Sequence, residues 1–155
     1  MEWKAKDIEV YLKEKSYIDT VIVPLIPISF GSHMKQIAEK GEFTHLLSQH
    51  LERQFKGRAL ALPPFTYLSE MADNEKVSSI QKWVEHMREH EVKYVFLLTS
   101  DESWRSMAEQ LSASLLFAAS VPLEHLDEQY KHSIMETQVK QLMNEIVQGW
   151  QGIAT

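Results

Sequence analysis

Polar side chains that could take part in chemistry stand at the ends of short apolar runs of this chain. They are Ser29, Ser32 and His33 after the first run, Tyr67 after the second, and Thr99, Ser100 and Asp101 at the end of the third. Hydroxyl, imidazole and carboxylate groups build nucleophilic sites when they lie within hydrogen-bonding reach of one another. We therefore expect these seven residues to form the ligand-binding site. Six of them, Tyr67 excepted, are also the candidates for a hydrolase or transferase of small molecules.

No recognised catalytic or cofactor motif accompanies these residues. The chain has no Gly-x-Ser-x-Gly elbow and no cysteine, and a single glycine, Gly31, precedes the helix expected after the first run. Dinucleotide and phosphate-binding loops need several glycines or a Gly-Lys-Ser/Thr ending. We assign no catalytic residue and expect no cofactor. The Gly31 turn is predicted to be an ordinary one with Ser32 as helix cap, and Thr99 with Glu102 is predicted to form a capping box.

Two of the seven histidines have a spacing that suits a metal ion. His86 and His90 are four residues apart, so one helix face can present both imidazoles to zinc. The His-Glu-x-x-His order is missing, and the same helix is expected to turn Trp83, Val84 and Met87 inward. We therefore place both histidines on the solvated side and predict no metal site.

The apolar runs themselves predict the architecture that positions these groups. Continuous apolar runs are typical of strands buried on both faces of a parallel sheet. The four predicted strands are Thr20–Ile28, Arg58–Pro63, Tyr94–Thr99 and Ser114–Val121, the first and third being neighbours at the sheet centre. Pro63 and Pro64 are expected to stop the second strand. The prediction is a three-layer α/β sandwich with a mostly parallel sheet of about four strands flanked by helices, whose ligands bind beyond the carboxyl ends of the strands.

Amphipathic stretches between the runs predict the helices. They are Trp3–Lys13, which we expect to lie as a lid on the sheet, Met34–Lys56 interrupted at Gly41, Asn74–Glu91, Ser103–Leu111 and Leu126–Gln151. The last is longer than a six-residue strand requires, so it should overhang the sheet. Its far end, at Ile146 and Trp150, is predicted to contact either the first helix, at Trp3 and Tyr11, or a second subunit.

Composition narrows the class of protein. A chain of 155 residues with 44% hydrophobic residues can bury one core, so we expect a single domain over residues 1–155. A net charge of −6 argues against nucleic acid as a partner. The absence of cysteine, the charged start of the chain and the short apolar segments argue against secretion and membrane insertion. We expect a cytoplasmic protein.

Three segments resemble a small uncharacterised family of spore-forming Gram-positive bacteria, the YpiF-like family. They read DTVIVPLIPISFG, ALALPPFTYL and YVFLLTSDESW. This resemblance extends over most of the chain and implies no particular activity. A more distant likeness joins Pro24 and Leu62-Pro63-Pro64 to scaffold positions of the creatininase-type amidohydrolases, which are metal enzymes with a layered α/β fold.

The metal ligands of that second family are missing from this chain. The alignment on Pro24 puts Ser29 at the position of a metal-binding Glu and Gly31 at the position of the first His. Thr99-Ser100-Asp101-Glu102 replaces the family's Asn-Gly-His-Gly-Gly-Asn loop. The likeness thus implies a shared fold without the metal chemistry.

The favoured function is that of a non-catalytic protein that binds a partner. The partner can be a second copy of the chain in a homodimer, another protein or a small molecule. The alternative is a small-molecule hydrolase or transferase at the carboxyl ends of the strands. A convergent pocket with perturbed titratable groups would favour the enzyme, whereas loops whose polar groups satisfy one another would favour the binder.

Overall fold

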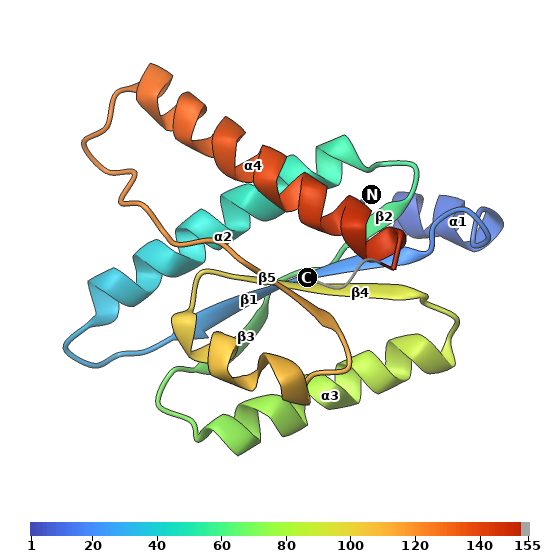
Figure 1. Ribbon diagram of the computed structural model, residues 1–155, viewed down its shortest axis with the longest axis horizontal. Coiled ribbons are helices and arrows are strands. Elements are labelled where there is room, and N and C mark those ends of the chain that lie inside the picture. The colour runs from blue at the N-terminus through green and yellow to red at the C-terminus, as the bar shows by residue number, and fades with distance from the viewer. Residues whose placement is uncertain (153–155) are drawn as a thin grey trace.

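Five parallel strands form the middle layer of the computed structural model, which describes residues 1–152 (Figure 1). They are β1 Thr20–Ile28, β2 Ala59–Ala61, β3 Phe65–Leu68, β4 Tyr94–Thr99 and β5 Ser114–Phe117. The order across the sheet is β2, β1, β4, β5, and β3 also pairs with β1. The predicted parallel sheet is confirmed, with β1 and β4 as central neighbours.

The two strands β2 and β3 occupy the same edge of β1, one after the other. Thr20 of β1 is in register with Ala59 of β2, and Leu25 of β1 is in register with Phe65 of β3. The diproline between them cannot donate backbone hydrogen bonds, so the edge strand is interrupted there and then resumes. The second strand stops at this point, as predicted, but β3, which continues the same edge, was not predicted.

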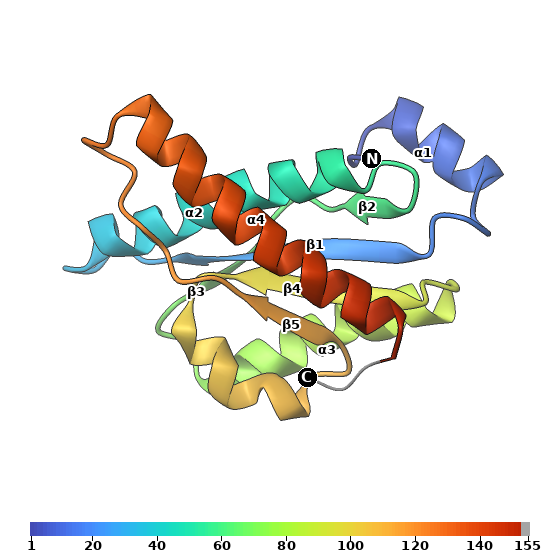
Figure 2. The ribbon, with the colours of Figure 1, turned by 45° about the horizontal axis from the view of Figure 1, so that its top comes forward.

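Helices cover both faces of the sheet (Figures 1 and 2). They are α1 Ala5–Lys13, α2 Met34–Gln54, α3 Asp73–Glu89, the 3₁₀ helix η1 Glu102–Gln110 and α4 Glu128–Trp150. In both views α2 and α4 lie on one face, and α3 and η1 lie on the other. The result is the expected three-layer sandwich. No helix within residues 1–152 is both long enough and apolar enough to cross a membrane.

Alternation along β1 divides the core into two layers. Val21, Val23 and Leu25 point to the face of α3 and η1, whereas Ile22 points to the face of α2 and α4. This is the two-residue period of a strand whose two faces are both covered.

The first residues of the chain run beside β2. The Met1 carbonyl accepts a hydrogen bond from the Ala61 N–H at 2.8 Å, and Glu2 forms a parallel bridge with Ala61. Helix α1 follows, and none of its residues is fully buried. It packs against the core only through the partly buried Ile8 and Tyr11. The first helix therefore covers its part of the sheet loosely.

The far end of α4 packs within the chain, but not where it was predicted to pack. Ile146 is fully buried, and the Trp150 indole meets the Phe55 ring edge-on at 5.0 Å between centroids. Trp150 also donates a hydrogen bond from Nε1 to Thr20 Oγ1 at 2.8 Å, and the Arg58 guanidinium lies 3.7 Å from its ring centroid. The expected contact with the first helix is wrong, because the end of α2 and the start of β1 occupy that place.

Three local predictions are also wrong. Helix α2 continues through Gly41, where a Cβ would lie 2.7 Å from Ile26 Cγ2, so the glycine permits close packing and does not break the helix. The N-cap residue of α2 is His33, and no side chain caps it. The cap of η1 is Asp101, which accepts a hydrogen bond from the Ser103 N–H, and the predicted Thr99–Glu102 capping box does not form.

Candidate functional site

The carboxyl ends of β3 and β4 hold a closed polar network. The Tyr67 hydroxyl donates to Asp101 Oδ2 at 2.5 Å, and Trp104 Nε1 donates to the Tyr67 oxygen at 2.7 Å. The second carboxylate oxygen of Asp101 accepts from the Ser103 N–H at 3.0 Å. Tyr67, Asp101 and Trp104 are all buried. Their polar atoms satisfy one another, as buried polar atoms must.

The network keeps its phenol neutral and its carboxyl ionised. Burial, with the hydrogen bond to Asp101, raises the pKa of Tyr67 far above the usual tyrosine value. Burial on its own would raise the pKa of Asp101, but the hydrogen bonds from Tyr67 and from the Ser103 N–H outweigh it and hold that pKa below the ordinary value. An ionised acceptor with a neutral donor makes a strong hydrogen bond that stabilises the turn into η1.

Lys76 of α3 is a buried charge that sequence reasoning did not single out. Its side chain is 3% exposed, with Nζ 3.5 Å from Ser103 Oγ and 5.6 Å from the centroid of the Tyr67 ring. Its positive charge helps to lower the pKa of Asp101. The signal for it was available, since Lys76 lies four residues before Ile80, on the inward face of the helix.

Ser29 and Thr99 stabilise the neighbouring loops. Ser29 Oγ donates to the Glu70 carboxylate, which lowers the pKa of Glu70, and accepts from the Gly31 N–H at 3.1 Å. Thr99 Oγ1 donates to the Leu25 carbonyl at 3.2 Å and accepts from the Asp101 N–H at 3.0 Å. Both hydroxyls thus hold loop backbone to the sheet.

The other predicted site residues do not join this network. Ser32 and His33 are exposed, and in residues 1–152 neither side chain forms a hydrogen bond. Ser100 is buried, and its Oγ has no hydrogen-bond partner in the described part of the chain. The structure therefore brings together Tyr67, Thr99 and Asp101. It does not pair a serine with a histidine, which activation of a serine nucleophile by an imidazole base would require.

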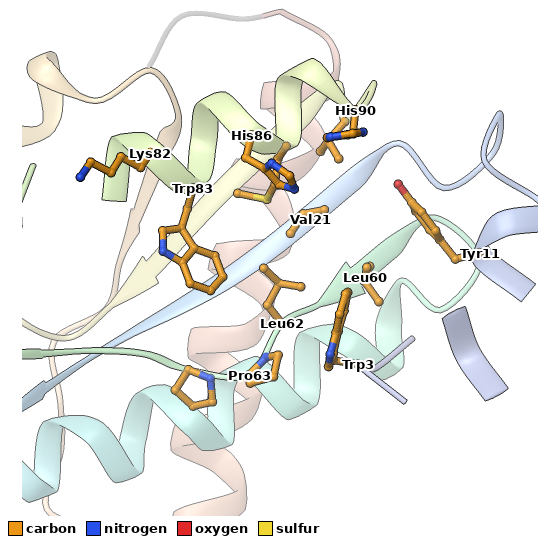
Figure 3. Close-up of a pocket in the computed structure, with 13 residues that line it drawn as sticks. Trp3, Tyr11, Val21, Leu60, Leu62, Pro63, Lys82, Trp83, His86 and His90 are labelled. Atoms are coloured by element: carbon orange, nitrogen blue, oxygen red, sulfur yellow. The ribbon is translucent and has the colours of Figure 1, made fainter. Parts of the chain in front are cut away.

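A groove of about 600 Å³ lies elsewhere, between the first residues of the chain, the end of β2 and α3 (Figure 3). Its floor is formed by the apolar side chains of Val21, Leu60, Leu62, Met87 and Val92. None of the seven predicted site residues lines it.

Aromatic side chains form the walls of this groove. Figure 3 shows the Trp83 indole from α3 and the Trp3 indole from the N-terminal segment on either side of Leu62 and Pro63. Tyr11 of α1 closes the end toward that helix. Trp3 is 60% exposed and Trp83 is 50% exposed, so both rings present large apolar faces to solvent.

The prediction that Trp83 points into the core is wrong. The indole is half exposed and forms a T-shaped contact with the Phe65 ring, at 5.9 Å between centroids. Sequence periodicity could not settle its position, because residue 83 lies one turn from the buried Ile80 and Met87 but at the margin of their stripe. Phe65 belongs to the strand that was missed, so the partner of Trp83 was missed as well.

His86 and His90 are exposed, as predicted, and they also line the groove. Their ring centroids are 4.6 Å apart, and the two ring planes are tilted by 53° to each other. Within residues 1–152 no cluster of three or more histidine, aspartate or glutamate side chains could hold a metal ion.

Two comparisons connect the chain to known sequences. The family described as "Protein of unknown function (DUF2487)" matches residues 9–150. The "Uncharacterized protein YpiF" of Bacillus subtilis (strain 168) is 43% identical over 153 residues, which cover 97% of this chain and 98% of the relative. No solved structure matches. The likeness to the creatininase-type fold therefore stays a prediction.

Proposed function

The chain belongs to the DUF2487 family, whose function is not known, and we propose that it is a non-catalytic binding protein whose ligand is a small apolar molecule held in the groove. The observation that carries the proposal is the groove itself. Its volume of about 600 Å³ falls in the range of small-molecule sites, about 300–1,000 Å³. Apolar floors with aromatic walls are typical of such sites.

The exposed indoles support a ligand-binding role. Burying a tryptophan ring against an apolar ligand removes a large area from water, at roughly 25 cal/mol for each Å². The bridge at Glu2 fixes the backbone next to Trp3, and the Trp83 ring contacts the Phe65 ring. A ligand between them would gain contact area while ordering few side chains, which favours affinity.

The strand ends support catalysis less well. Tyr67 and Asp101 are hydrogen-bonded to each other and Ser29 to Glu70, so their polar atoms already have partners. A hydrolase or transferase there would have to open these bonds before a substrate could reach them. Apart from Ser100, whose Oγ has no partner within residues 1–152, the buried polar side chains at this edge satisfy one another, as expected of a binding protein.

Binding of a neutral apolar dye tests the proposal. Nile red is expected to bind the wild-type protein saturably, with one site per chain and a rise in dye fluorescence. Trp3→Ala removes one wall of the groove and should weaken binding about tenfold, which corresponds to about 1.4 kcal/mol.

Phe30→Ala is the matched control. Phe30 is a large aromatic residue, 82% exposed, that does not line the groove, so its removal should leave the affinity unchanged. Equal loss in both variants would indicate dye adsorption to exposed aromatics and would overturn the proposal. A wild-type chain that sediments as a dimer and gains dye binding only on dilution would assign the groove to a second copy instead.

A further inference from the structure

We infer that the groove selects a molecule with a single carboxylate at one end of an apolar body, and that His86 and His90 bind this carboxylate. The inference rests on the proposed function, because it names the ligand class for the same groove. It follows from the distribution of charge around the groove and from the place of the two imidazoles along α3 (Figure 3).

The ionisable groups that line the groove are basic, whereas the chain as a whole is acidic. The whole chain carries 22 acidic residues and a net charge of −6. Among residues 1–152, no carboxylate side chain lines the groove, whereas Lys82, His86 and His90 do. A concave apolar surface with basic groups on one wall is complementary to an anion that has an apolar body.

The two imidazoles lie together on one wall. His86 and His90 are one helical turn apart on α3, and their ring centroids are 4.6 Å apart, so both can contact one small anionic group. Each neutral imidazole has one N–H donor and each protonated imidazole has two. Hydrogen bonds from these donors to a carboxylate are charge-assisted and stronger than neutral ones.

Acidic groups near the groove limit where the anion can lie. Glu91 raises the pKa of Tyr11 through its negative charge, after the larger effect of burial, so it lies close to the Tyr11 end. Glu91 also lines a neighbouring hollow, together with Tyr11, Lys15, Ser16, Asp19, His90 and Lys93. Glu85 and Glu89 are on α3 but do not line the groove. The carboxylate is therefore expected at the imidazoles and not beyond Tyr11, where Glu91 would repel it.

This position leaves the apolar body over the indoles. His86 follows Trp83 by three positions, which corresponds to about 4.5 Å along the helix axis at 1.5 Å per residue. A chain or ring attached to a carboxylate at His86 would extend across Leu62 and Met87, between Trp83 and Trp3. The apolar surface and the two imidazoles thus contact opposite ends of one ligand.

A matched series of octyl compounds tests the inference by displacement of Nile red at neutral pH. Octanoate, octanol and octylammonium share one apolar chain and differ in head-group charge. Octanoate should displace the dye at a concentration about tenfold lower than octanol, and octylammonium should be weakest. The double variant His86→Ala/His90→Ala should bind octanoate and octanol equally well.

His132→Ala is the control variant. This histidine is exposed on α4, with its imidazole 3.8 Å from the Glu136 carboxylate. Because it does not line the groove, its removal should leave the octanoate preference unchanged. Far-ultraviolet circular dichroism of each variant shows whether the fold is retained.

The outcomes separate the two proposals. Equal displacement by octanoate and octanol in the wild type would overturn the inference and leave the proposed function intact. Saturable dye binding that none of the three compounds displaces would overturn the inference too, whereas absence of saturable dye binding would overturn the proposed function. Octyl phosphate, added as a fourth compound, distinguishes the head groups, and a clear preference for it over octanoate would overturn the assignment of a carboxylate.

Discussion

Two tryptophans on the same side of the sheet show how differently this chain uses its polar and its apolar sites. Trp104 of η1 is completely buried, and its N–H is hydrogen-bonded to Tyr67. Trp83 of α3 is half exposed and forms the wall of a groove. At the strand ends, therefore, the buried side chains of Tyr67, Asp101 and Trp104 satisfy one another. The edge beside β2 is a place where apolar surface stays uncovered.

The cause of this difference lies in the edge strand. The diproline interrupts the pairing of the edge strand with β1. Leu62, just before the diproline, lines the groove, and Phe65, just after it, contacts the Trp83 ring. Helix α1 buries none of its residues and does not fill the space. At the other end of the sheet β4, β3 and η1 converge, so their side chains pack closely. Exposed apolar surface of this kind commonly marks a contact site.

The largest expected effect is that of Trp104→Ala on stability. This change removes a fully buried indole and the N–H that donates to Tyr67, so the free energy of unfolding should fall by about 3–5 kcal/mol. Denaturation in urea, followed by circular dichroism, measures it. A loss below about 1 kcal/mol would mean that the strand-end network is not a packed core.

The strands and the parallel sheet could be predicted because their signal is local. The bounds of β1 and β4 coincide with the apolar runs, since strands buried on both faces need apolar residues at nearly every position. Of the seven candidate residues, Asp101 is hydrogen-bonded to Tyr67 and Thr99, whereas Ser32 and His33 are exposed. That the seven residues bind a ligand stays a prediction.

The groove could not be predicted, because it depends on contacts between distant segments. Trp3, Leu62 and Trp83 are far apart in the sequence, and the sequence around each is equally compatible with a residue of the core. Lys76 shows the same limit for charge. A lysine on an inward helix face needs polar partners, and here Ser103 and the Asp101 carboxylate supply them. The contact between α3 and η1 that brings them together cannot be predicted from the sequence of either segment alone.

An intermediate effect is expected for Tyr67→Phe. The change leaves Asp101 and the Trp104 N–H without their buried partner, which should destabilise the fold by about 1–3 kcal/mol. Tyr11→Phe is the matched control in the groove. Its hydroxyl is only partly buried, and the change should stay within about 0.5 kcal/mol. Similar losses in the two variants would remove the contrast between the closed network and the open groove.

The pH dependence of stability sharpens the same comparison. The folded-state pKa of Asp101 is lowered, so the ionised carboxylate contributes to the free energy of unfolding above the ordinary pKa of 3.8. This contribution is lost as the pH falls through the folded-state pKa. Because the folded-state pKa of Tyr67 is raised, its contribution is present below pH 10.0 and is lost as the pH rises further. Urea denaturation should therefore show a smaller loss of stability in Tyr67→Phe than in the wild type at both extremes.

A small effect on stability, with a large effect on binding, is expected for Trp83→Ala. The indole is 50% exposed and forms a T-shaped contact with Phe65, so its removal should lower the free energy of unfolding by only about 1 kcal/mol. The same change removes one wall of the groove, and the affinity for Nile red should fall about tenfold or more. A ligand that binds only the folded chain stabilises it by mass action, so saturating octanoate should raise the melting temperature of the wild type more than that of Trp83→Ala. If Trp83→Ala instead destabilised the chain as much as Trp104→Ala while the affinity for the dye stayed the same, the indole would be a core residue, as its spacing in the sequence suggested, and the groove would not be a binding site.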